Sequence, residues 1–146
     1  MATSMIGMAC DHAGYTLKEE LKKILQTMGY TVKDFGAYSD ESVDYPDFAH
    51  SLAKEIEQGN LSKGIAICGS GNGISMTANK HSNVRAALCW IPEIARLARE
   101  HNDANILSLP ARFITIEEAK KILDIFLKTP FEGGRHERRV RKIELS

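Results

Sequence analysis

Residues 63–80, KGIAICGSGNGISMTANK, join a short apolar run, a glycine-rich turn and a helical pattern. Lys63–Cys68 has the length and the composition of a buried strand. Gly69–Gly73 places three glycines in five residues, and Ile74–Lys80 is expected to form the helix that follows. A strand, a tight turn and a helix in this order indicate one unit of a βαβ fold.

Four more apolar runs of strand length lie on either side of this unit, separated by stretches with helical periodicity. The expected strands are Met5–Cys10, Thr31–Phe35, Val84–Cys89 and Asn105–Leu109. The other expected helices are Tyr15–Met28, Asp44 to about Gln58, Pro92–His101, Thr115–Leu127 and the basic segment Arg135–Leu145. Five strands that alternate with helices predict an α/β fold: a Rossmann-like doubly wound domain whose five-stranded parallel sheet is covered on both faces, with a basic C-terminal helix.

Length, charge and cysteine content narrow the class of protein. A chain of 146 residues suits one domain over residues 1–146. Nineteen Lys and Arg balance nineteen Asp and Glu, which argues against a chain-wide basic surface for nucleic acid. No apolar run approaches the roughly 18–20 residues of a membrane span, and Met1–Ser4 has no features of a secretory signal. The three cysteines are widely spaced and odd in number, which argues against a disulfide framework and against a CxxC metal site. We therefore expect the protein to work in the reducing cytoplasm.

Cys68 and the turn after it are the first candidate site, because ligands of a doubly wound sheet bind beyond the carboxyl ends of its strands. The glycines allow successive N–H groups to point at one anion, and the following helix adds partial positive charge. The anion is a phosphate, an enediolate oxygen or the Cys68 thiolate itself, so Cys68 is a candidate base or nucleophile. The turn alone is also typical of structural connections, since it is neither GxGxxG nor a P-loop. Cys10 and Cys89 are expected to be small buried hydrophobes.

Three other polar sites, at residues 11–12, 101 and 135–139, have both a structural and a functional interpretation. Asp11 is either a helix N-cap beside a solvent-facing His12 or part of a site. His101 shares a helix face with apolar residues, which is typical of a core histidine. Arg135 and Arg139 lie one helical turn apart and can clamp a phosphate, although a solvated basic helix is the more frequent outcome and leaves nucleic-acid binding as a remote alternative.

Six motifs in one order resemble the ribose-5-phosphate isomerase type B family, which includes allose-6-phosphate and galactose-6-phosphate isomerases. The motifs are Cys10–Gly14, Asp44–Asp47, Ile67–Ser75, Ala78–Lys80, Glu100–Asn105 and Glu132–His136, and the resemblance runs from about Met5 to Ile143. It implies an aldose–ketose isomerase of the non-oxidative pentose phosphate pathway that needs no metal or organic cofactor. It also implies a homodimer, in some members paired into tetramers, with active sites built from both subunits.

The resemblance assigns roles to individual residues. Cys68 matches the base that moves a proton between carbons C2 and C1 of the sugar, and Ser70 keeps a hydroxyl beside that base. The N–H groups of the turn match the anion hole for the enediolate; they belong to Gly69, Ser70, Gly71, Asn72 and Gly73. His101 matches the group that opens the furanose ring, helped by Asp11 and Asn102. His12, Arg112, Arg135 and Arg139 match phosphate ligands, some of them expected from the neighbouring subunit, and Tyr45 matches a residue lining the sugar site.

Two other functions are compatible with this sequence. The same chemistry on a six-carbon phosphosugar, such as allose 6-phosphate, would differ in pocket length at Tyr38–Val43 and Ile91–Glu93. A phosphosugar-binding protein without catalysis is the second alternative. The joint presence of Cys68, Ser70 and His101 in one chain favours catalysis over binding alone.

Overall fold

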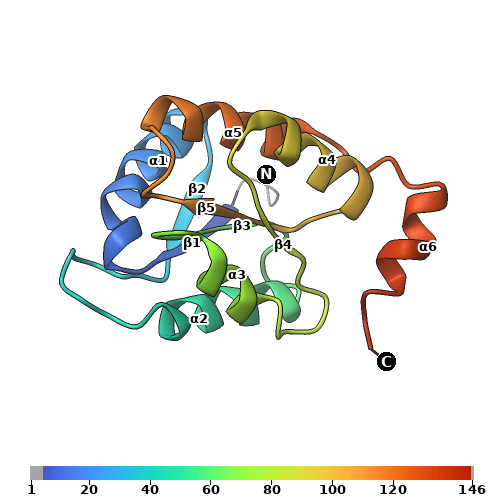
Figure 1. Cartoon of the computed structure of the whole chain (residues 1–146), viewed down its shortest axis with the longest axis horizontal. Helices are drawn as coiled ribbons and strands as arrows, with labels where there is room; N and C mark the ends of the chain where they lie inside the picture. Colours follow the sequence, from blue (N-terminus) through green and yellow to red (C-terminus); the bar gives the residue numbers. More distant parts are fainter. Residues whose placement is uncertain (1–4, 146) are drawn as a thin grey trace.

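A twisted sheet of five parallel strands forms the centre of the protein, which we describe from a computed structural model covering residues 5–145 (Figure 1). The expectation for Met1–Ser4 lies outside the described residues. The strands are β1 Met5–Cys10, β2 Thr31–Asp34, β3 Gly64–Cys68, β4 Ala86–Leu88 and β5 Ile106–Pro110. Their order across the sheet is β2-β1-β3-β5-β4, and every pairing is parallel. The predicted doubly wound α/β fold is confirmed.

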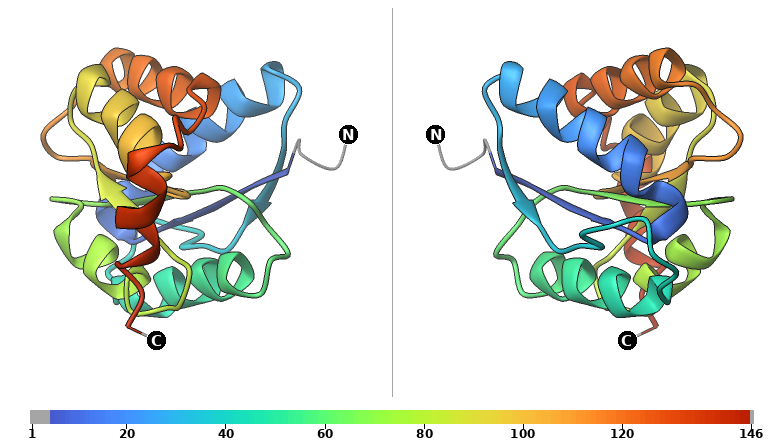
Figure 2. Two further views of the ribbon diagram at one scale, coloured as in Figure 1. Left: turned by 90° about the vertical axis from the view of Figure 1, so that its right-hand side faces the viewer. Right: turned by 90° about the vertical axis from the view of Figure 1, so that its left-hand side faces the viewer.

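Helices cover both faces of the sheet (Figures 1 and 2). One layer contains α1 Tyr15–Thr27, α4 Pro92–Asn102 and α5 Ile116–Lys128, and the other contains α2 Tyr45–Glu57 and α3 Asn72–Ala78. A short 3-10 helix, η2 His12–Gly14, precedes α1, and the sixth α-helix, α6 Arg135–Arg141, lies beside α4 at one side of the molecule. Among the described residues, no helix has both the length and the apolar character that crossing a membrane requires.

The central strand β3 shows why the sheet has two cores. All five of its residues are buried, and successive side chains point to opposite faces. Ile65 and Ile67 pack in the cluster that contains residues of α1 and α5, whereas Ala66 and Cys68 pack with α2 and α3. A continuous apolar run is what a parallel strand needs when helices cover both of its faces. The Cys68 side chain therefore points to the α2 and α3 side of the sheet.

Two helices, α3 and α6, differ from the sequence prediction by more than one residue at an end. The helix after the glycine turn begins at Asn72 rather than Ile74, because Gly71 takes a left-handed conformation with φ 78° and starts the helix directly. The basic helix ends at Arg141 and does not reach Leu145, so that prediction is wrong at its C-terminal end. Glu144 Oε1 accepts a hydrogen bond of 2.8 Å from Asn83 N, which ties the last described residues to the loop before β4 instead of extending the helix.

Candidate active site

An open pocket of about 490 Å³ lies at the carboxyl end of β3, where the sequence predicted a ligand site. Cys68 is the last residue of the strand and pairs in register with Pro110 of β5. The pocket is lined by Asp11, Tyr45, Cys68, Gly69, Ser70, Gly73, Arg112 and Phe113. The structure thus brings together side chains that follow β1, β3 and β5, as the parallel arrangement of the strands requires.

The glycine turn presents several backbone donors at this pocket. The N–H groups of Gly69, Ser70 and Gly71 have no hydrogen-bond acceptor among residues 5–145. Ser70 Oγ accepts a hydrogen bond of 3.2 Å from Asn72 N, so the serine hydroxyl is held within the turn. Ser75 Oγ donates to Gly71 O at 2.7 Å and fixes the turn against the first turn of α3. Unpaired N–H groups of this kind form a concave donor surface that suits an oxyanion.

Arg112 brings a positive charge to the same turn. Ala111 N donates to Cys68 O at 2.9 Å and Arg112 N donates to Gly69 O at 3.0 Å, so hydrogen bonds join the loops after β3 and β5. The guanidinium lies over Gly69, with Nη1 only 3.1 Å from the position a Cβ atom of that residue would take. A planar guanidinium beside free backbone donors suits a phosphate.

Asp11 and His12 border the pocket from the end of β1. Asp11 Oδ1 accepts a hydrogen bond of 3.1 Å from Gly14 N, which confirms the N-cap interpretation, and the same residue lines the pocket. His12 Nδ1 accepts a hydrogen bond of 3.2 Å from Val43 N. The imidazole of His12 is therefore oriented by the polar loop before α2, with its Nε2 left without a partner among the described residues.

Tyr45 reaches the pocket from the start of α2. Its ring packs so closely on Gly73 that a Cβ atom added to that glycine would lie 2.7 Å from Tyr45 Oη. A glycine at position 73 is needed for this close approach. The phenol hydroxyl thus lies beside the first turn of α3, near the free N–H groups of the turn.

The remaining predicted residues do not join Cys68 within one chain. Helix α4 starts after β4 at the carboxyl edge of the sheet and ends at Asn102, just before β5 begins at the amino edge. Five residues of β5 separate the two edges, which is roughly 16 Å along the strand. Asn102 lines a different cavity of about 550 Å³, together with residues of the C-terminal segment. His101 and Asn102 are therefore at the opposite end of the sheet from Cys68.

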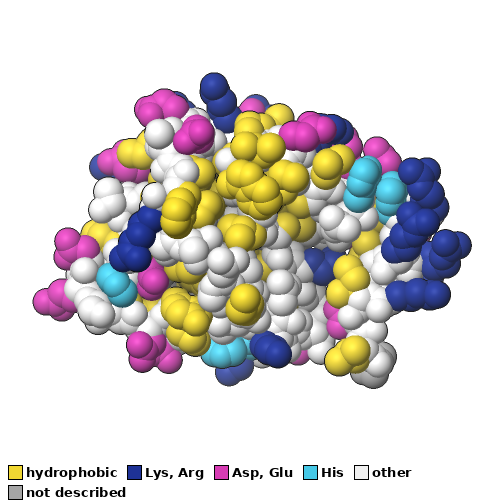
Figure 3. Space-filling model, in the orientation of Figure 1, with side chains coloured by type: hydrophobic (Ala, Val, Ile, Leu, Met, Phe, Trp, Pro, Cys, Tyr) yellow, Lys and Arg dark blue, Asp and Glu magenta, His cyan; other side chains and the backbone are white. Residues whose placement is uncertain are grey.

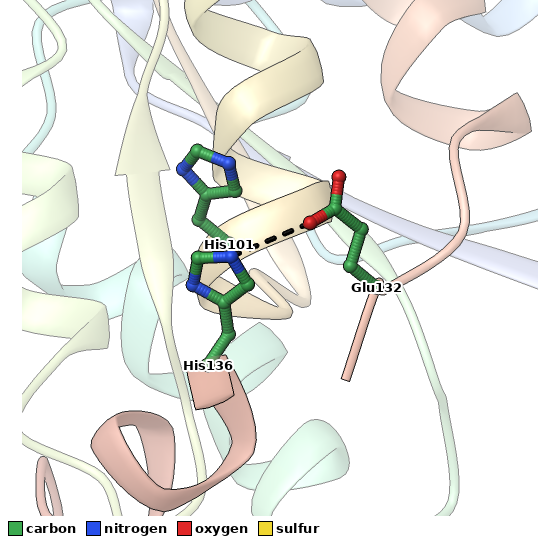
Figure 4. A group of neighbouring side chains, drawn as sticks. All are labelled: His101, Glu132 and His136. Carbon is green, nitrogen blue, oxygen red and sulfur yellow. Dashed lines mark ion pairs between the residues drawn. The ribbon is translucent and has the colours of Figure 1, made fainter. Parts of the chain in front are cut away.

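His101 packs on the C-terminal helix instead of the apolar core. Its imidazole stacks on that of His136, with ring centroids 4.3 Å apart and planes tilted by 14° (Figure 4). The expectation of a core histidine is wrong, since His101 is half-buried and its ring partner belongs to α6. Arg135 and Arg139 are exposed on α6, and Lys and Arg side chains gather over this helix (Figure 3). His136 belongs to the motif Glu132–His136, which assigns it no role, and only the tertiary packing shows that it touches His101.

Cys10 and Cys89 are structural, as predicted. Both are fully buried, and burial raises the pKa of each thiol to about 12. Cys10 Sγ donates to Ala37 O at 3.8 Å. Neither lines the pocket, so Cys68 is the cysteine at the candidate site.

The parallel sheet, the donor turn and the arginine at its carboxyl edge define a Rossmann-like α/β protein whose strand ends suit an anionic ligand. Comparison with known sequences then identifies the family. The chain belongs to the ribose/galactose isomerase family, whose sequence model matches residues 6–143.

Individual relatives agree over nearly the whole chain. Ribose-5-phosphate isomerase B of Escherichia coli is 44% identical, covering 94% of this chain and 93% of that protein. The crystal structure of a ribose 5-phosphate isomerase from Thermotoga maritima superposes with a TM-score of 0.95 at 52% identity, covering 98% of this chain and 99% of that one. The Mycoplasma genitalium ribose-5-phosphate isomerase B, solved with bound ribulose-5-phosphate, gives a TM-score of 0.91 at 47% identity and covers 95% and 93% of the two chains.

Proposed function

We propose that this protein is an aldose–ketose isomerase that interconverts D-ribose 5-phosphate and D-ribulose 5-phosphate in the cytoplasm. Its relatives carry the name ribose-5-phosphate isomerase B, and one of them was solved with the ketose phosphate bound. The observation that carries the proposal is the position of Cys68, at the end of β3 and beside free N–H groups and the Arg112 guanidinium.

Cys68 is the base in this proposal. Its thiolate removes a proton from C2 of the open-chain aldose and returns it to C1, while the proton on the C2 hydroxyl moves to the carbonyl oxygen on C1. The intermediate between the two sugars is an enediolate. Its negative charge requires donors that are already in place, and the N–H groups of Gly69, Ser70 and Gly71 supply them. Ser70 keeps a hydroxyl beside the thiol.

Ribose 5-phosphate must be opened before this proton transfer, because the furanose has no carbonyl. A general acid–base group takes the proton from the C1 hydroxyl and delivers one to the ring oxygen as the bond between C1 and O4 breaks. Histidine titrates near neutral pH and suits this exchange. We assign the step to His101, with Asp11 and Asn102 as its helpers.

A second copy of the chain completes the site in this proposal. His101, Arg135 and Arg139 lie far from Cys68 in one chain, so the partner subunit's His101 would face the thiol of the first subunit. Large apolar side chains are exposed at the carboxyl edge of the sheet: Trp90 and Ile91 follow β4, and Phe113 lines the pocket with 74% of its surface exposed. Burial of such a patch against another copy favours a homodimer.

The phosphate is held by residues of both copies. Arg112 and His12 approach it from the side of Cys68, and Arg135 and Arg139 approach from the basic helix of the partner. Binding energy at the phosphate, remote from C1 and C2, holds the sugar in position for proton transfer. Tyr45 lines the sugar between these two ends.

The experiment is turnover of ribose 5-phosphate and allose 6-phosphate by the unmodified protein, Cys68→Ala and Cys89→Ala. Cys89→Ala is the matched control, since it removes a buried thiol outside the pocket. We expect Cys68→Ala to lower kcat by about 10²–10⁴-fold, the usual contribution of a positioned base. The control should keep its turnover. Preference for the allose substrate would change the assigned sugar, and binding without turnover of either sugar would contradict catalysis.

A further inference from the structure

Three metal-binding side chains converge beside the C-terminal helix: His101 at the end of α4, Glu132 in the segment before α6, and His136 on α6. One ligand atom from each lies within 4.8 Å of the other two (Figure 4). Glu132 N donates to Glu100 O at 3.1 Å, which fixes the acidic residue next to the last turn of α4. The cluster therefore depends on tertiary contacts between two separate elements of the fold.

His136 supplies a second, independent observation. The residue is only 7% exposed, and its Nε2 has no hydrogen-bond partner among the residues described here. Glu132 Oε1 lies 3.3 Å from that nitrogen and forms an ion pair with it when the imidazole is protonated (Figure 4). A buried polar atom normally has a partner. The Nε2 atom faces Glu132 inside the cluster, where a cation between the two would bind both the nitrogen and the carboxylate.

We propose that His101, Glu132 and His136 bind a divalent transition-metal cation of the Zn²⁺ type. Two imidazole nitrogens and one carboxylate oxygen are a donor set that zinc takes in proteins, with a fourth position left for water or another ligand. Zinc–ligand distances of about 2.0–2.2 Å bring ligand atoms to about 3.3 Å from one another. The stacked His101 ring must turn toward the carboxylate for this, because a metal lies in the plane of each imidazole that binds it. His101 is half-buried and belongs to the last turn of its helix.

Cation binding has a consequence that rests on the proposed function. A metal on His101 binds the lone pair of the neutral imidazole, which the ring-opening step needs as a base, so the cation acts as a reversible inhibitor. Ribulose 5-phosphate cannot form a furanose, because its O5 carries the phosphate, and it enters the reaction as an open chain. Inhibition should therefore be stronger with ribose 5-phosphate than with ribulose 5-phosphate as substrate.

The binding test uses Zn²⁺ alone and isothermal titration calorimetry on the full chain. All variants carry Cys68→Ala, so that the pocket thiol does not compete for the metal. We expect one Zn²⁺ per chain, with affinity reduced at least tenfold by Glu132→Gln and by His136→Gln. His50→Gln is the matched control, because His50 and His81 form the other histidine pair, 2.7 Å apart between ring nitrogens. Equal affinity in all variants, or loss in the His50 variant alone, would overturn the site.

The activity test uses chains that retain Cys68. We expect Zn²⁺ to inhibit the unmodified protein more strongly with ribose 5-phosphate, EDTA to restore turnover, and Glu132→Gln to resist the same Zn²⁺ concentration. Equal inhibition of Glu132→Gln would show that the inhibitory metal binds elsewhere and would overturn this part. The calorimetry separates the two proposals, because it does not depend on isomerase activity. If the protein binds Zn²⁺ through Glu132 and His136 but does not turn over either sugar, the metal site stands and the proposed function is wrong.

Discussion

Arg112 and Gly69 are in contact across the loops that leave β5 and β3. The Arg112 N–H donates to Gly69 O at 3.0 Å, and the guanidinium occupies the space where a side chain at position 69 would begin. We expect Gly69→Ala to displace the guanidinium while it keeps the N–H group of the turn. The KM for ribose 5-phosphate should rise about tenfold, equivalent to one charge-assisted hydrogen bond, with a smaller change in kcat. Steady-state kinetics measure both constants.

Arg112→Gln is the companion variant for this contact. It removes the guanidinium without adding volume at the turn, so its KM should rise at least as much as that of Gly69→Ala. A normal KM in Gly69→Ala beside a raised KM in Arg112→Gln would mean that the arginine reaches the phosphate from another position.

A site built from two chains predicts complementation between inactive variants. Cys68→Ala and His101→Ala remove groups that belong to different halves of the proposed site. Random exchange of subunits gives about half mixed dimers, and each mixed dimer has one complete site, so about a quarter of the original sites return. Activity should therefore appear after the two inactive proteins are unfolded together and refolded, when ribose 5-phosphate turnover is assayed.

Two controls define the outcome of that experiment. Each variant refolded alone should stay inactive, and a double variant Cys68→Ala/His101→Ala mixed with either single variant should give no recovery. If the mixture of single variants also stays inactive although mixed dimers form, Cys68 and His101 do not act in one shared site.

The half of the site around Cys68 could be predicted from sequence because it depends on local order and on one general rule. Asp11 and Cys68 each end or follow an apolar run, and parallel strands place such positions at one edge of the sheet. The glycines of the turn predict the start of α3 to within two residues of its observed position. No local pattern distinguished Arg112; the resemblance supplied it, and the structure adds the contact with Gly69.

The position of His101 could not be predicted, because helical periodicity gives a face and not the element that packs on it. The stacking with His136 joins residues 35 positions apart and depends on how α6 returns to α4. The end of α6 could not be predicted for a similar reason. Its basic residues continue a helical pattern, but the contact between Glu144 and Asn83 is formed with a distant loop.

The buried Lys18 ammonium predicts a pH-dependent contribution to stability. Lys18 is 0% exposed and donates to Asp34 Oδ1 at 2.6 Å and to Ala37 O at 2.7 Å. Burial alone would raise the pKa of Asp34, but hydrogen bonds from Lys18, Lys22 and Gly36 N outweigh it and hold that pKa below its usual value. Ionised Asp34 therefore stabilises the folded protein. Its contribution is complete above the pKa that Asp has in the unfolded chain, about 3.9, and is lost as the pH falls through the lower pKa of Asp34 in the folded protein.

Lys18→Met should lower the free energy of unfolding by about 3–5 kcal/mol at neutral pH, because it leaves the Asp34 carboxylate without its buried partner. Lys22→Met removes the more exposed partner and should cost about 1 kcal/mol or less. Urea unfolding between pH 3 and pH 7 measures both effects. Asp34→Asn should reduce the loss of unfolding free energy between pH 7 and pH 3. If that loss is unchanged in Asp34→Asn, other carboxylates cause it.

Thiol labelling provides the last prediction, since the three cysteines differ in their surroundings. Burial holds the pKa of Cys10 and Cys89 at about 12, so at pH 8 fewer than about one in a thousand of these thiols is ionised in the folded protein. Cys68 lines the open pocket beside the donor turn. Iodoacetamide should therefore modify one thiol per folded chain, and peptide mapping should locate it at Cys68.

Cys68→Ala should remove the fast label, whereas Cys89→Ala should keep it. Ribose 5-phosphate should slow the labelling, because it occupies the same pocket; rapid modification of Cys10 or Cys89 in the folded protein would contradict their structural role.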